Sequence, residues 1–159
     1  LADTTKISCM IMVIVTGAVI FGHFMAITRV PYELAEWVSS LPLPSHAVMG
    51  VIILVYLFGG CFMDALAMIM LTIPIFFPVV QTLGFDPIWF GVVIVLITEM
   101  GVITPPVGVN VYVVYGVAKD VPLENIFRGV FPMLLALLLC NLILLMFPQI
   151  ALFLPSLMN

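Results

Sequence analysis

The apolar stretch from Ile88 to Ala118 is interrupted at its centre by a polar, helix-breaking motif, Gly101-Val102-Ile103-Thr104-Pro105-Pro106-Val107-Gly108-Val109-Asn110. Two adjacent prolines between glycines stop a helix, and bilayer hydrocarbon cannot hydrogen-bond the backbone groups that are freed. Such a break is tolerated only where protein or a polar cavity surrounds it. We therefore expect a binding site at residues 101–110, in the manner of the discontinuous helices of transporters.

The composition is that of an integral membrane protein. Hydrophobic residues make up 65% of the 159 positions and charged residues only 8%, proportions far from those of an ordinary soluble domain. The net charge of −4 is spread thinly and there is no basic cluster, which argues against a nucleic-acid partner. The three cysteines show no CxxC spacing and suit small buried hydrophobes. The sequence carries no hydrolase, redox or phosphate-loop signature, so we do not expect an enzyme.

Hydrophobic runs divide the chain into segments, because about 20 apolar residues cross a bilayer core of about 30 Å as a helix. We expect a transmembrane helix at 1–30, an interfacial connection at 31–45, a helical hairpin at 46–83 with its tip at 59–64, a discontinuous transmembrane helix at 88–118 with its break at 101–108, a cytoplasmic loop at 119–128 and a last transmembrane helix at 129–155. The expected fold class is all-α. A start without Met that opens directly into a membrane helix suggests a piece of a longer polypeptide.

The run from Ala47 to Leu83 must turn, because its 37 residues would form a helix about 55 Å long, nearly twice the hydrocarbon thickness. The Gly59-Gly60 pair and Asp64 mark the turning point. Pro74 and Pro78 predict kinks or an early end in the second arm. The two arms are either compact spanning helices or a re-entrant hairpin whose tip stops inside the protein.

The basic residues predict the topology. A hairpin and a pair of full spans both return the chain to the side it came from, so Lys6, Lys119 and Arg128 share one side of the membrane and Arg29 lies on the other. By the positive-inside rule the first side is cytoplasmic. The hairpin is then expected to open toward the outside, and the C-terminus is expected to be periplasmic.

The break offers two kinds of binding group. Pro105 and Pro106 suit the first turn of a second half-helix, and Thr104 precedes them as a candidate N-cap. The N-terminus of that half-helix presents free N–H groups and partial positive charge, which suit a carboxylate. The first half-helix is expected to end near Met100, with unpaired carbonyl groups that suit a cation.

Two glycines and one amide complete the expected site. Gly101 and Gly108 allow close backbone approach. Asn110 adds a side-chain amide one turn further along. The alternative is a proline kink that is packed for structural reasons only.

Two acids lie within membrane segments. Asp64 follows the Gly59-Gly60 pair and is expected to cap a helix that begins at Ala65; it either does only this or also takes part in an ion or substrate site. Glu99 lies just before the break, where a structural role and a functional role are equally expected. His23, on the first span, is expected to be a helix-contact residue.

Several spaced motifs together resemble the C-terminal part of the large membrane subunit of the TRAP (tripartite ATP-independent periplasmic) transporters. They are Gly60-x-x-x-Asp64, Ile73-Pro74-Ile75-x-x-Pro78, Gly84-x-Asp86-Pro87-x-x-Phe90-Gly91 and Ile103-Thr104-Pro105-Pro106-Val107-Gly108-x-Asn110, followed by Phe147-Pro148 and Leu154-Pro155 near the end. The combination covers nearly the whole chain and is far more specific than any single motif.

The resemblance implies a secondary transporter of the elevator type in a bacterial inner membrane. Such proteins couple uptake of an organic acid, for example a C4-dicarboxylate, sialic acid or a keto acid, to a sodium gradient. Their partners are a periplasmic substrate-binding protein and a small membrane subunit. They contain inverted repeats, each with a re-entrant hairpin and a discontinuous helix, and this chain would hold mainly the second repeat. No cofactor is implied besides Na⁺ as the coupling ion.

By this resemblance the hairpin tip and the helix break form one site for Na⁺ and the substrate carboxylate. The expected binding residues are Gly59, Gly60, Asp64, Gly101, Thr104, Pro105, Pro106, Gly108 and Asn110, with Na⁺ held by Thr104, Gly101 and Gly60, largely through backbone carbonyls. Two alternatives remain: another carboxylate or cation symporter with the same hairpin architecture, and a non-transporting membrane scaffold subunit.

Overall fold

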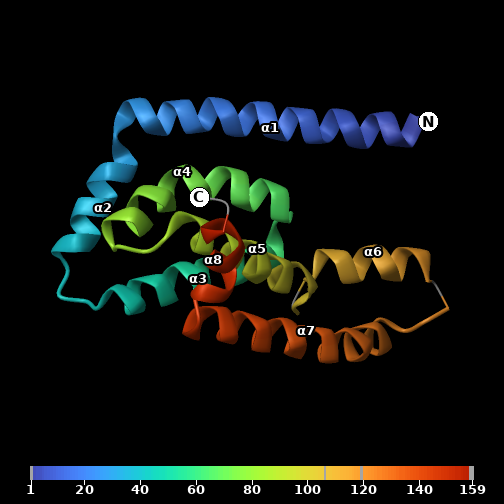
Figure 1. Cartoon of the computed structure of the whole chain (residues 1–159). Coiled ribbons are helices and arrows are strands. Elements are labelled where there is room, and N and C mark those ends of the chain that lie inside the picture. The colour runs from blue at the N-terminus through green and yellow to red at the C-terminus, as the bar shows by residue number, and fades with distance from the viewer. Residues whose placement is uncertain (1, 106, 119, 158–159) are drawn as a thin grey trace.

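The computed structural model describes residues 2–105, 107–118 and 120–157, and all the regular secondary structure within them is helical. The elements are α1 (Ala2–Thr28), α2 (Val30–Ser40), α3 (Ser45–Phe62), α4 (Ala65–Thr82), α5 (Pro87–Ile103), α6 (Val109–Val117), α7 (Leu123–Met146) and α8 (Gln149–Ser156) (Figure 1). The expected all-α fold class is confirmed. Pro106 of the expected site and Lys119 of the topology argument lie outside the described residues.

Helices α3 and α4 form a hairpin, but its turn is shorter than expected. Gly59 and Gly60 do not break the chain and lie within α3, so that only Met63 and Asp64 separate the two helices. Asp64 caps α4 as expected, because its Oδ2 accepts hydrogen bonds from the backbone N–H groups of Leu66 at 3.0 Å and Ala67 at 3.3 Å. The expected tip at 59–64 thus reduces to two residues.

The second hairpin arm continues past both of its prolines. Pro74 and Pro78 lie inside α4, which ends only at Thr82, so an early end at the prolines is wrong. Each arm has 18 residues, a length of about 27 Å. Both arms are long and apolar enough to cross a membrane, and the choice between a re-entrant hairpin and two full spans stays open.

The next helix is interrupted as expected. Asp86 caps α5 by accepting hydrogen bonds from the N–H groups of Ile88 and Trp89 at 2.7 and 3.2 Å, and Pro87 occupies the first turn. The chain leaves the helix after Ile103 and re-enters one only at Val109. The second half-helix therefore begins after the prolines and not at them, which corrects the expected start.

Three other boundaries differ from the expected segments. The interfacial connection is largely a helix, α2, with Pro31 in its first turn. The expected loop at 119–128 already contains the start of α7 at Leu123. The last segment is two helices, because α7 ends at Met146 and α8 begins after Pro148, whose ring removes the N–H that a continuous helix would need.

The core lies between α3, α4 and α5. Its largest fully buried side chains include Tyr56 of α3, Val80 of α4 and both Phe90 and Ile94 of α5. Figure 1 shows α1 and α7 on opposite sides of this centre, with the N-terminal half of α1 and all of α6 extending beyond it.

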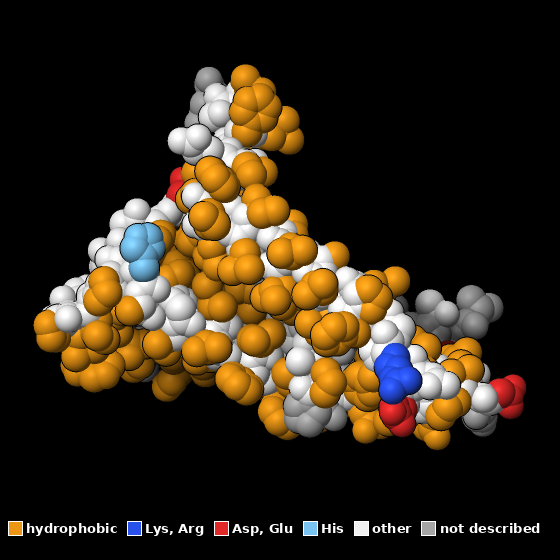
Figure 2. All heavy atoms as spheres, turned by 90° about the horizontal axis from the view of Figure 1, so that it is seen from below, with side chains coloured by type: hydrophobic (Ala, Val, Ile, Leu, Met, Phe, Trp, Pro, Cys, Tyr) orange, Lys and Arg blue, Asp and Glu red, His pale blue; other side chains and the backbone are white. Residues whose placement is uncertain are grey.

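The outer surface suits a membrane. Helices α1, α3, α4 and α7 are each long and apolar enough to cross one, and α5 is apolar but has 17 residues. The face in Figure 2 is covered by hydrophobic side chains, with few charged ones. Together, these features describe an all-α membrane protein with a helical hairpin beside a discontinuous helix.

Candidate functional site

Helices α3 and α5 cross in direct backbone contact at two glycines. A Cβ atom placed on Gly101 would lie 2.8 Å from the Cα atom of Gly60 and 2.8 Å from the carbonyl oxygen of Leu57. A Cβ atom on Gly60 would lie 3.0 Å from the carbonyl oxygen of Thr98 and 3.2 Å from the Cα atom of Gly101. The close approach expected of Gly101 is confirmed, and its neighbour is the hairpin helix.

The crossing brings two helix C-termini together. Helix α3 ends at Phe62, two residues after Gly60, and α5 ends at Ile103, two residues after Gly101. The last four carbonyl groups of a helix lack intrahelical partners and carry the negative end of its dipole. The place where α3 and α5 end side by side therefore holds carbonyl oxygens without helical partners, although those of Gly59, Met100 and Gly101 accept hydrogen bonds from Met63 and Thr104.

Thr104 ends the first half-helix and does not begin the second. It is the C-cap of α5: its N–H donates to the carbonyl of Gly101 at 3.1 Å, and its Oγ1 donates to the carbonyl of Met100. Its expected role as N-cap is wrong, because a threonine hydroxyl can bond the carbonyl four residues earlier.

Gly108 begins the second half-helix. Its φ of 57° lies in the left-handed region, which glycine adopts without strain. A Cβ atom here would meet Cε1 of Phe127 at 3.3 Å and the carbonyl oxygen of Thr104 at 3.3 Å, so the loop closes tightly over the end of α5. Asn110 is exposed on the first turn of α6.

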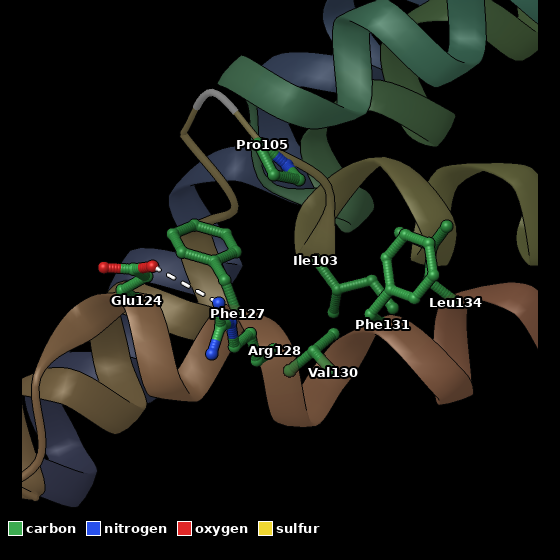
Figure 3. A pocket seen from close by; sticks show the side chains of 8 residues that line it. All are labelled: Ile103, Pro105, Glu124, Phe127, Arg128, Val130, Phe131 and Leu134. Carbon is green, nitrogen blue, oxygen red and sulfur yellow. Dashed lines mark ion pairs between the residues drawn. The ribbon is translucent and has the colours of Figure 1, made fainter.

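The remaining expected residues lie at the edges of the crossing. Gly59 faces Met68 of α4, because a Cβ atom on Gly59 would meet the methyl group of that side chain. Asp64 caps α4 and is exposed. Pro105 lines a cavity of about 370 Å³ between the break and the start of α7, together with Phe127 and other α7 residues (Figure 3).

Sequence reasoning missed a polar residue in α7. Asn141 is 3% exposed, and its Nδ2 donates to the sulfur of Met100 at 3.8 Å. Its Oδ1 has no hydrogen-bond partner in the part of the chain that the structure describes. An amide within an otherwise apolar span was the signal that could have drawn attention to it.

The acidic side chains do not converge on the break. Glu99 of α5 is exposed. Among residues 2–105, 107–118 and 120–157, no group of three His, Cys, Asp or Glu side chains could hold a metal ion. The crossing itself contains the carbonyl oxygens of Leu57 and Thr98, and the Thr104 hydroxyl follows at the end of α5.

The two roles considered for Asp64 can be separated by one pair of variants. Asparagine caps a helix about as well as aspartate, whereas alanine loses the cap at a cost of about 1 kcal/mol. Since both of these hydrogen bonds of Asp64 go to the first turn of α4, Asp64→Asn should keep the melting temperature of the unmodified protein, while Asp64→Ala should lower it. A lower melting temperature of Asp64→Asn would show that the charge itself is needed.

Comparison with known proteins supports the resemblance seen in the sequence. Residues 1–150 match the family model described as the DctM component of the tripartite ATP-independent periplasmic transporter. The C4-dicarboxylate TRAP transporter large permease protein DctM of Pseudomonas aeruginosa is 36% identical over 98% of this chain and 36% of its own length. The sialic acid TRAP transporter large permease protein SiaM of Vibrio cholerae is 34% identical over 99% of this chain and 36% of its own length.

A third relative is named for another substrate, isethionate. The isethionate TRAP transporter permease protein DctMQ of Oleidesulfovibrio alaskensis is 37% identical over 92% of this chain and 23% of its own length. The chain thus spans about a third of the length of the first two relatives. With four helices able to cross a membrane among the described residues, these matches indicate a multi-pass inner-membrane protein. The chain belongs to the DctM family, the large permease component of the tripartite ATP-independent periplasmic transporters.

Proposed function

We propose that this chain supplies most of the second repeat of a permease that moves an organic acid across the bacterial inner membrane in symport with Na⁺. It works with a small membrane subunit and a periplasmic substrate-binding protein, and its C-terminus lies in the periplasm. The observation that carries the proposal is the backbone contact between Gly60 and Gly101. A scaffold has no need to bring the last turn of a hairpin helix against the last turn of a discontinuous helix.

The proposed ion site lies where α3 and α5 end. Free carbonyl groups follow Gly60 on one helix and Gly101 on the other. The Thr104 hydroxyl uses its proton on the carbonyl of Met100, so its oxygen lone pairs are left for a cation. Hard oxygen ligands without a cluster of carboxylates suit a monovalent ion.

The proposed carboxylate site lies at the start of α6. The first N–H groups of this helix have no partner within it, and they carry the positive end of its dipole. Gly108 leads into this turn and Asn110 lies within it, exposed. The substrates in the names of three relatives are organic acids: a C4-dicarboxylate and sialic acid carry carboxylates, and isethionate carries a sulfonate. An acid of this class is the substrate that we propose.

Thr104→Val in the complete transporter tests the ion site. If the hydroxyl oxygen is a ligand, its loss should raise the Na⁺ concentration for half-maximal uptake about tenfold, the equivalent of about 1.4 kcal/mol. The measurement is uptake into proteoliposomes as a function of external Na⁺, with the binding protein present. Thr104→Ser, which keeps the hydroxyl, should restore most of the affinity.

Thr82→Val is the matched control. Thr82 also bonds a carbonyl four residues earlier, that of Pro78 at 3.1 Å, but it lies at the far end of α4 from the tip. Loss of the Thr82 hydroxyl should leave the Na⁺ dependence of uptake unchanged. An unchanged Na⁺ dependence in Thr104→Val would remove Thr104 from the ion site, and the family membership would stand.

A further inference from the structure

The cavity beside the break opens along the first three turns of α7. Six of its lining residues are apolar: Ile103, Pro105, Phe127, Val130, Phe131 and Leu134. Its volume of about 370 Å³ lies within the usual range of ligand pockets, about 300 to 1,000 Å³. Ile103 and Pro105 form one wall and α7 forms the other (Figure 3).

The charged groups of the cavity lie at one end only. Glu124 and Arg128 stand together in the first turns of α7, and Figure 3 shows Leu134 at the opposite end. Residues 124 and 134 are ten positions apart, a distance of about 15 Å along the helix. The cavity is therefore polar at its mouth and hydrocarbon-like beyond it.

The position of the mouth matches the depth of lipid headgroups. Helix α7 has 24 residues and is about 36 Å long, which exceeds the hydrocarbon core of about 30 Å. A helix centred on that core extends about 3 Å beyond it at each end, so that Glu124 lies at the headgroup boundary and the long side chain of Arg128 reaches it. Phe131, 65% exposed, then faces the acyl-chain region.

The two charges of the mouth remain available to a ligand. The guanidinium of Arg128 and the carboxylate of Glu124 are 3.9 Å apart, and both side chains are at least 80% exposed. An ion pair of this length and exposure contributes little. A ligand that presents an anion to Arg128 and a cation to Glu124 would satisfy both groups at once.

We propose that this cavity is a binding site for one zwitterionic phospholipid with a primary ammonium group, phosphatidylethanolamine. Its phosphate contacts Arg128 and its ammonium contacts Glu124. One acyl chain lies along the apolar wall toward Leu134 and packs against Ile103 and Pro105 of the break. The lipid thereby fills the space between the discontinuous helix and α7.

Native mass spectrometry of the complete transporter tests the site. The protein is exchanged into detergent with equal amounts of phosphatidylethanolamine and phosphatidylglycerol, and the lipid that stays bound is identified. We expect one phosphatidylethanolamine per large subunit, retained in preference to phosphatidylglycerol. Arg128→Gln should lower its retention about tenfold, and Glu124→Gln should shift the preference toward phosphatidylglycerol.

Two further variants separate binding from folding. Leu134→Trp fills the apolar end of the cavity and should abolish retention of both lipids. Asp120→Asn removes an acid that lies just before α7 and outside the cavity, and it should change nothing. The melting temperature of each variant shows that the fold is kept. Three results would overturn the proposal. Leu134→Trp could retain as much lipid as the unmodified protein, or the unmodified protein could prefer phosphatidylglycerol. The third result is no bound lipid, because another part of the polypeptide fills the cavity.

Discussion

Gly101→Ala should reduce sodium-driven uptake by the complete transporter by more than tenfold. The new Cβ atom would lie 2.8 Å from both the Cα atom of Gly60 and the carbonyl oxygen of Leu57. These are backbone atoms, which cannot rotate away as a flexible side chain can. Forcing an extra carbon into such a contact costs about 1 to 3 kcal/mol and separates the helices. Gly101→Val should abolish uptake.

The other glycines provide a graded series on the same two helices. Gly60→Ala should be less severe, because its Cβ atom would meet backbone at 3.0 and 3.2 Å. Gly59→Ala should be milder still, since the obstacle is the end of the flexible Met68 side chain. Gly91→Ala is the control within α5, because no atom lies within 4 Å of its Cβ position.

The order of these effects distinguishes a helix contact from a general need for glycine. Uptake into proteoliposomes gives the rate, and the amount of folded transporter recovered in detergent shows whether a variant assembles. We expect uptake to fall in the order Gly91, Gly59, Gly60 and Gly101. If Gly101→Ala transports as well as Gly91→Ala, the two helix ends do not need to touch, and the proposed ion site between them loses its basis.

Local features of the site could be read from the sequence, because they depend on neighbouring residues only. The two prolines and Gly108 predict an interruption wherever the surrounding helices lie. Asp64 and Asp86 cap the helices that follow them through bonds that span two or three residues. Such short-range chemistry is independent of the tertiary fold.

The location of each break within its motif was not predictable in the same way. Gly59 and Gly60 were expected to be turn residues, but both lie within α3. The missing side chain of Gly60 lets the backbone of α3 approach that of α5. A glycine that permits a helix contact and a glycine that breaks a helix look alike in one sequence. From the sequence, Thr104 could cap either half-helix. Its hydrogen bond to the carbonyl of Met100 shows that it caps the end of the first half-helix, α5.

Contacts between distant segments could not be predicted from the sequence. Nothing in the pattern of α7 shows that Asn141 meets Met100 or that Phe127 packs over Gly108. These contacts join the last helix to the break, so α7 is part of the environment of the candidate site. The clearest such link is at the other end of α5.

Trp89→Ala should be among the most destabilising single substitutions in the chain. The Trp89 side chain is 3% exposed and stacks on Phe85 with ring centroids 5.3 Å apart. Its Nε1 donates to the carbonyl of Leu144 at 2.8 Å, in the last turn of α7, where carbonyl groups lack a helical partner. Truncation to alanine removes both the packing and this bond, a loss of about 3 to 5 kcal/mol.

Trp89→Phe separates the two contributions, because it keeps an aromatic ring and removes only the donor. The carbonyl of Leu144 would then be buried without a partner, at a cost of about 1 to 3 kcal/mol. Trp37→Phe is the control, since Trp37 is 60% exposed. The melting temperature of the detergent-solubilised transporter should fall most for Trp89→Ala, less for Trp89→Phe and little for Trp37→Phe. Equal melting temperatures for Trp89→Phe and the unmodified protein would mean that the bond does not hold the end of α7 against the start of α5, and that this helix pair is fastened by apolar packing alone.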